Sequence, residues 1–97
     1  LKNVFIPSIF SPNDDNINDI FNIHPQPEIE IHDILVNIFD RWGNMVFQST
    51  DYPFAWNGHF NENVLSPGVY VYLIKVGYIT SGEEKEKVFY GDITLIR

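Results

Sequence analysis

The chain of 97 residues has no cysteine, and its six Lys and Arg face 13 Asp and Glu, which gives a formal net charge of −7. Without cysteine, neither a disulfide framework nor a thiolate zinc site can form. The scarcity of basic residues argues against binding to nucleic acid or to anionic lipid, because both need clustered cations. The sequence therefore predicts no nucleic-acid partner.

Long apolar runs are also missing. The longest, Val69–Ile74, is far shorter than the roughly 20 residues of a membrane-spanning helix. We therefore predict no direct insertion into a membrane. No segment shows apolar residues at helical spacing, and a chain of this length fits one domain, so we treat residues 1–97 as a single domain.

What the chain does have is aromatic and β-branched residues in short runs between turn signals. Such runs predict strands, and the large rings help a small core to offset the chain entropy lost on folding. The fold class that this pattern predicts is all-β, an antiparallel immunoglobulin-like β-sandwich of about seven strands. The runs are Val4–Phe10, Ile20–Ile23, Ile29–Phe39, Met45–Phe47, Val69–Val76 and Val88–Ile96.

Two hairpins follow from the pattern. Residues 34–49 form the first, because apolar residues alternate along its first half and Gly43 beside Asn44 suits a tight turn. Both faces of that first half are mostly apolar, which predicts a central strand. The second hairpin joins 69–79 to 87–96 through 80–83, with a bulge expected at Gly77 and a short strand around 54–56.

A cluster of carboxylates and amides occupies residues 13–19. Calcium prefers several such oxygens at once, and mutual repulsion of the acids favours a cation among them. Asn and Asp also serve turns by bonding to their own backbone, and we favour that simpler explanation over the metal. Calcium is the only cofactor that the sequence suggests. Its candidate ligands are Asn13, Asp14, Asp15, Asn18 and Asp19.

Catalysis is not indicated. Asp14 and Asp15 are adjacent, with no base or nucleophile set against them, and the three His residues share no ligand spacing. We therefore predict that the protein is not an enzyme. Six aromatic residues suit core packing better than a sugar-binding platform. They are Trp42, Tyr52, Trp56, Tyr70, Tyr72 and Tyr90.

Several blocks occur in a fixed order along the chain: Pro7–Asn13 with Asn18-Asp19, Arg41-Trp42-Gly43, Trp56-Asn57-Gly58, Pro67–Tyr70 and Thr94–Arg97. In this order they resemble the gliding motility-associated C-terminal domain family of Bacteroidetes, the type B sorting domains of the type IX secretion system. The residues that match the family motifs are Pro12, Asn13, Asp15, Asn18, Asp19, Arg41, Trp42, Gly43, Trp56, Gly58, Gly68, Tyr70 and Arg97. Asn16 departs from the glycine that the family usually has there.

The resemblance implies a non-catalytic C-terminal secretion signal, part of a larger secreted protein. Its cargo would be exported through the periplasm and the outer membrane to the cell surface or the medium. The implied partners are the type IX machinery and an outer-membrane protein of the PorP/SprF type. The alternative is a calcium-stabilised adhesive or carbohydrate-binding β-sandwich, in which the acidic loop itself serves ligand binding.

Overall fold

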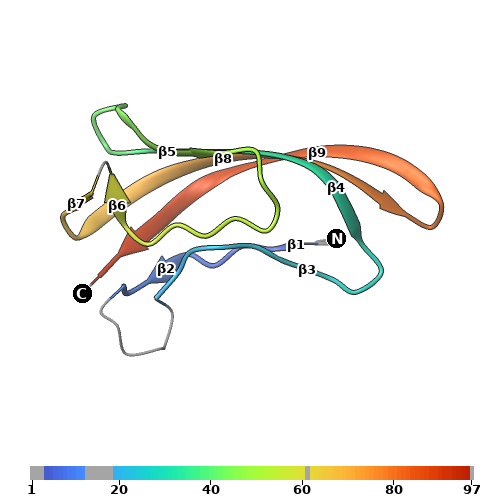
Figure 1. Ribbon diagram of the computed structural model, residues 1–97, viewed down its shortest axis with the longest axis horizontal. Coiled ribbons are helices and arrows are strands. Elements are labelled where there is room, and N and C mark those ends of the chain that lie inside the picture. Colours follow the sequence, from blue (N-terminus) through green and yellow to red (C-terminus); the bar gives the residue numbers. More distant parts are fainter. Residues whose placement is uncertain (1–3, 13–18, 61, 97) are drawn as a thin grey trace.

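The computed structural model in Figure 1 describes residues 4–12, 19–60 and 62–96, and all regular elements among them are β-strands. Four strands are long: β4 (Glu30–Phe39), β5 (Met45–Ser49), β8 (Gly68–Thr80) and β9 (Glu83–Leu95). Five have two residues each: β1 (Val4–Phe5), β2 (Ile9–Phe10), β3 (His24–Pro25), β6 (His59–Phe60) and β7 (Asn63–Val64). The prediction of about seven strands was therefore too low, because the pattern does not reveal two-residue strands.

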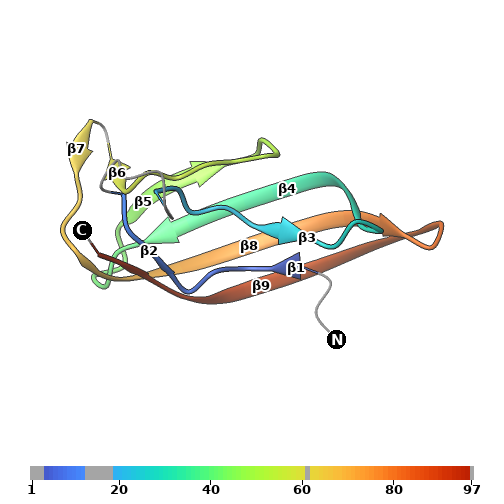
Figure 2. The ribbon, with the colours of Figure 1, turned by 90° about the horizontal axis from the view of Figure 1, so that it is seen from below.

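The long strands form one sheet in the order β2-β9-β8-β4-β5. Its pairs are antiparallel, except that the short β2 runs parallel to the end of β9. A covering layer, made of residues 4–8, 19–29 and 50–58, lies along one face of this sheet (Figures 1 and 2). The prediction of an all-β, mostly antiparallel sandwich is confirmed, whereas the immunoglobulin-like strand order stays a prediction.

Both predicted hairpins are present. β4 pairs with β5 and β8 pairs with β9, and β4 lies between β8 and β5, as its two apolar faces predicted. The bulge predicted at Gly77 lies in the neighbouring strand β4 instead of in β8. The register breaks in β4 between Ile31 and Asp33, directly opposite Gly77. A Cβ on Gly77 would lie 3.1 Å from Cβ of Asp33, so the glycine leaves room for the bulged strand beside it.

The core lies between the sheet and the covering layer. Alternate residues of β4 and β8 face the core, as period-two strands require. The covering layer contributes aromatic rings from the opposite side of the core. No polar side chain is buried among the described residues. The largest fully buried side chains are Trp56, Phe10, Phe21, Ile38, Ile74, Ile93, Leu95, Val36 and Val76.

Trp56 is the centre of the covering layer, with only 1% of its surface exposed. Its ring centroid lies 5.2 Å from that of Phe10 and 5.5 Å from that of Tyr70, which belongs to β8. The indole Nε1 donates to the carbonyl of His59 at 3.2 Å, so its one polar group is satisfied. The strand predicted around Phe54–Trp56 is wrong in extent, because among the described residues this segment pairs only through an isolated bridge between Trp56 and Phe21.

We expect Trp56→Ala to lower the free energy of unfolding by roughly 3–5 kcal/mol, because it removes a large buried ring and leaves a cavity. The matched control is Tyr90→Ala, whose ring is 79% exposed. That change should alter stability by less than about 0.5 kcal/mol. Chemical denaturation followed by fluorescence measures both, and equal losses in the two variants would contradict this account of the core.

Candidate functional site

Four of the sequence blocks meet at one end of the sandwich, on the left in Figure 1. We call this the motif end. It contains the β4–β5 turn (Asp40–Asn44), the end of β2, the start of β8 and the end of β9. The chain reverses at the opposite end between β8 and β9. The topology therefore gathers on one surface residues from near the start, the middle and the end of the chain.

The β4–β5 turn is built around the carboxylate of Asp40. Its Oδ1 accepts from the backbone N–H groups of Trp42 and Asn44, both at 2.9 Å, and its Oδ2 accepts from the Asn44 amide at 3.2 Å. Gly43 takes a φ of +86°, a left-handed conformation that glycine adopts without a steric penalty. The turn therefore holds Arg41 and Trp42 in a defined geometry although it is exposed.

Opposing effects act on the pKa of Asp40. Loss of water around the carboxyl group raises the pKa, but hydrogen bonds from Asn44, Trp42 and Gly43 stabilise the ionised form and lower it. The bonds prevail, so the pKa of Asp40 lies below its usual value. Asp40 is therefore ionised at neutral pH, the form that organises the turn.

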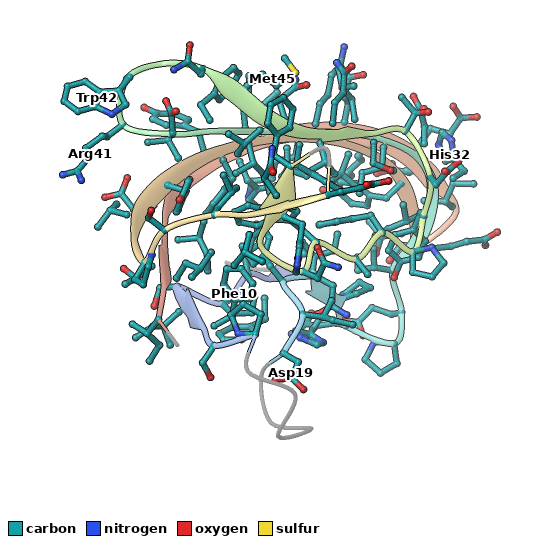
Figure 3. The ribbon with its side chains drawn as sticks, turned by 60° about the vertical axis from the view of Figure 1, so that its left-hand side comes forward. Phe10, Asp19, His32, Arg41, Trp42 and Met45 are labelled. Carbon is teal, nitrogen blue, oxygen red and sulfur yellow. The ribbon has the colours of Figure 1, made fainter. Side chains whose placement is uncertain are left out.

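Trp42 projects from this turn into solvent with 78% of its surface exposed. Figure 3 shows Arg41 and Trp42 side by side, pointing away from the body of the domain. The guanidinium carbon of Arg41 lies 5.6 Å from the centroid of the Trp42 ring, within the range of a cation–π contact. Trp and Arg are both among the residue types enriched at the positions that dominate binding at protein interfaces.

A hollow of about 230 Å³ lies next to the exposed pair. The turn residues Asp40–Trp42 form one wall and residues 65–70 form the other. Arg41 and Trp42 from one sequence block and Pro67–Tyr70 from another therefore line the same concave surface. A concave surface with a rigid aromatic rim can receive a protruding side chain or loop.

The other described motif residues have structural roles. Trp56 is in the core, and Gly58 is buried with a φ of +80° in the turn that follows it. The Tyr70 hydroxyl donates to the carbonyl of Ser66 at 2.7 Å, which fixes the segment that enters β8 through Gly68. These residues shape the surface around the hollow, whereas Trp42 is exposed to solvent beside Arg41.

The acidic cluster falls mostly outside the described residues. Asn13, Asp14, Asp15 and Asn18 lie there, as does Arg97, while Pro12 and Asp19 are half-buried at the two ends of that segment. Figure 3 shows Asp19 on the side of the motif end away from Trp42. Within residues 4–12, 19–60 and 62–96, no three His, Asp or Glu side chains gather as a metal site would require. Calcium binding stays a prediction.

The aromatic residues weighed for a sugar platform do not share a surface. Trp56 and Tyr70 are buried and Tyr72 packs against the core, whereas Trp42, Tyr52 and Tyr90 are exposed on three separate elements. The sequence favours the interpretation of these aromatic residues as core and hairpin packing. That interpretation holds for Trp56, Tyr70 and Tyr72. In the described part of the chain, no helix is long and apolar enough to cross a membrane.

The fold and the motif end define a small β-sandwich with an exposed Arg–Trp pair beside a hollow. A family model described as the CHU_C type IX secretion signal domain matches residues 4–94. The chain belongs to this family of secretion signal domains, as its sequence blocks indicated. It therefore has a sorting role in export to the cell surface or the extracellular space. A comparison with curated proteins gives no match.

Sequence reasoning missed Asp40, which organises the exposed turn. The signal was available, because an Asp that opens a turn commonly bonds to backbone N–H groups two to four residues later. Residues Leu65 and Ser66 of the hollow were also missed. Nothing local marks them, since they meet the β4–β5 turn only through the pairing of β4 with β8.

We predict that Asp40 titrates with a midpoint below the ordinary value for an aspartate. Because the folded pKa is lowered, the turn is stabilised above the unfolded pKa of about 3.9 and loses this stabilisation as the pH falls through the folded pKa. NMR titration of the Asp40 carboxyl carbon measures the midpoint, and the amide signals of Trp42 and Asn44 should move with it. A midpoint at or above that of a model peptide would contradict the hydrogen-bonded turn.

If the acidic cluster holds calcium, calcium should raise the melting temperature of the parent chain. Replacing Asp15 and Asp19 by Ala should then abolish any rise in melting temperature that calcium gives the parent chain. Thermal denaturation with calcium and with a chelator measures this. Identical curves for the parent chain in the two buffers would leave the cluster with a turn-forming role only.

Proposed function

We propose that this domain is a non-catalytic C-terminal signal, read in its folded form, that directs an attached cargo through the type IX secretion system across the outer membrane. The cargo ends at the cell surface or in the medium. The proposed partner is an outer-membrane protein of the PorP/SprF type that acts with the secretion machinery. Membership of the type IX secretion signal family supports this proposal.

The observation that points to the reading surface is the exposed Arg41-Trp42 pair beside the hollow. An exposed tryptophan costs solubility, and large exposed apolar groups rimmed by polar residues are typical of interaction sites. Here Asp40 orders the turn through three hydrogen bonds, so little side-chain and loop entropy is lost when a partner binds. We infer that the type IX partner contacts Trp42 and Arg41 and fills the hollow.

The Asp19 side of the motif end offers a second, separate contact region under this proposal. A partner that spans the motif end would meet Asp19 and the β4–β5 turn together. The negative net charge of the chain favours a partner with a basic face. The core residues beneath, such as Trp56, act only by holding this surface in shape.

The export test fuses residues 1–97 to the C-terminus of a leader-bearing fluorescent protein, with expression in a gliding bacterium that has or lacks a working type IX system. The matching PorP/SprF-type protein is supplied. We expect secretion that depends on the system, and at least about ten-fold less secretion when Arg41 and Trp42 are both replaced by Ala. The fluorescence in the medium and on the cell surface is measured.

The matched control is Leu73→Ala, which truncates a half-exposed side chain on the outer face of β8, away from the hollow. All variants should keep a free energy of unfolding within about 1 kcal/mol of the parent. Export by the parent fusion without a working type IX system would contradict the sorting proposal. Loss of export in Leu73→Ala but not in the Arg41, Trp42 variant would place the reading surface on the outer sheet face instead.

A further inference from the structure

Strand β9 has one open edge. β8 pairs with it along its whole length, but β2 covers the other side only at the end, where Thr94 and Ile96 donate to the carbonyls of Ser8 and Phe10 at 2.9 and 3.0 Å. Backbone groups alternate sides along a strand, so the even-numbered residues of 84–92 also direct N–H and C=O groups outward. In the described part of the chain, no strand pairs with that side of 84–92.

The side chains along this edge form a charged half and an apolar half. On the outer face of the sheet, Glu84 and Glu86 precede Val88 and Tyr90, which are 52% and 79% exposed. On the inner face, Lys85 and Lys87 precede Phe89. Any strand added here would therefore face alternating charges along 84–87 and apolar groups along 88–90, and each face of the sheet would present one sign of charge along 84–87.

The inner side of the edge has room for another side chain. A hollow of about 310 Å³ separates β9 from the start of the chain, lined by Val4, Phe5, Ile6, Tyr72, Lys87 and Phe89. The Nζ of Lys87 lies 5.4 Å from the centroid of the Phe89 ring, and among the described residues no carboxylate lies within ion-pair distance of it. The hollow therefore suits an apolar side chain that is followed by an acidic one.

The two ion pairs along the edge do not block such a strand. Lys85 lies 3.7 Å from Glu83 on its own strand, and Glu86 lies 3.5 Å from Lys75 on β8. All four side chains are at least half exposed, and exposed pairs of this kind contribute little to stability. Both pairs can therefore shift or add a partner when an oppositely charged strand arrives.

A second copy of the chain does not fit this edge. In a two-fold antiparallel pair, each register centred on residues 85 to 89 sets at least one pair of like charges opposite one another. Centring on Lys87 opposes it to itself, centring on 86 opposes Lys85 to Lys87, and centring on 88 opposes Glu84 to Asp92. Like charges directly opposite destabilise a strand pair. The charge order thus disfavours self-association, a known way of protecting edges.

We propose that the open edge of β9, residues 84–92, accepts an extended segment of a partner protein as an added antiparallel strand. The segment has acidic residues opposite Lys85 and Lys87, basic residues opposite Glu84 and Glu86, and apolar residues opposite Val88 and Phe89. The backbone supplies the pairing and the alternating charges supply the register and the specificity. This site is distinct from the Arg41-Trp42 surface and goes beyond the export function.

The test uses the 97-residue chain and the peptide KVTIVEKEK, which places its two Glu residues opposite Lys85 and Lys87 in the antiparallel register. The control peptide, KVTIVKEKE, has the same composition with the charges exchanged. NMR titration of the labelled chain should show the matched peptide shifting the amide signals of residues 84, 86, 88, 90 and 92 most. We expect it to bind at least about ten-fold more tightly than the control.

Two variants examine the mechanism. Val88→Pro removes an N–H that faces the open side and leaves the β8 ladder intact, whereas Val88→Ala keeps that N–H. We expect Val88→Pro alone to abolish binding, with both variants folded by circular dichroism. Should the proline variant fail to fold, the double variant Lys85→Glu, Lys87→Glu provides the test, because it should remove the preference for the matched peptide.

Three results would overturn the proposal. Equal affinity of the two peptides would show that charge order does not select the strand. Unchanged binding in Val88→Pro, or unchanged preference in the double Lys variant, would place the contact elsewhere. Dimerisation of the parent chain that Val88→Pro abolishes, measured by analytical ultracentrifugation, would make a second copy the occupant.

Discussion

The packing of aromatic rings around Trp56 is the interaction on which the rest of the structure depends. The covering layer has almost no sheet of its own, because its strands are two residues long and the bridge between Phe21 and Trp56 is isolated. It stays on the sheet because Trp56 contacts Phe10 within the N-terminal segment and Tyr70 on β8. Burial of such large rings is the main favourable term available to a small domain without cross-links.

This packing also explains why the family motif mixes two kinds of residue. Trp56, Gly58 and Tyr70 are buried and give the motif end its shape, whereas Arg41 and Trp42 are exposed on a turn that the Asp40 carboxylate holds. A linear motif does not separate these roles. The structure separates them into buried residues that order the surface and an exposed pair that a partner can reach.

The sequence predicted those elements whose stability is local. Alternation in residues 34–38 and the turn residues Gly43 and 81–82 specify both hairpins without reference to the rest of the chain. Tertiary contacts decide the remainder. The two-residue strands of the covering layer exist only because of their neighbours, and the bulge opposite Gly77 belongs to the facing strand.

The site was harder to predict than the fold. Trp42 has the same neighbours in sequence whether it packs inward or projects, so its exposure follows only from the structure. The hollow beside it needs β4 and β8 to be adjacent. The family, by contrast, was predictable from the ordered blocks, because several turn and strand motifs in one order are far more specific than any one of them.

The central claim is that the type IX partner reads a folded surface, which the Trp56 core maintains, rather than a linear peptide. The most direct measurement is the affinity of the purified chain for the proposed PorP/SprF-type partner, compared with that of the double variant Ile38→Ala, Trp56→Ala. That variant keeps every exposed motif residue but loses two fully buried side chains, enough to unfold a small domain. We predict no binding by the variant once circular dichroism shows it to be unfolded. Binding by the unfolded variant as tight as that of the parent would contradict the claim.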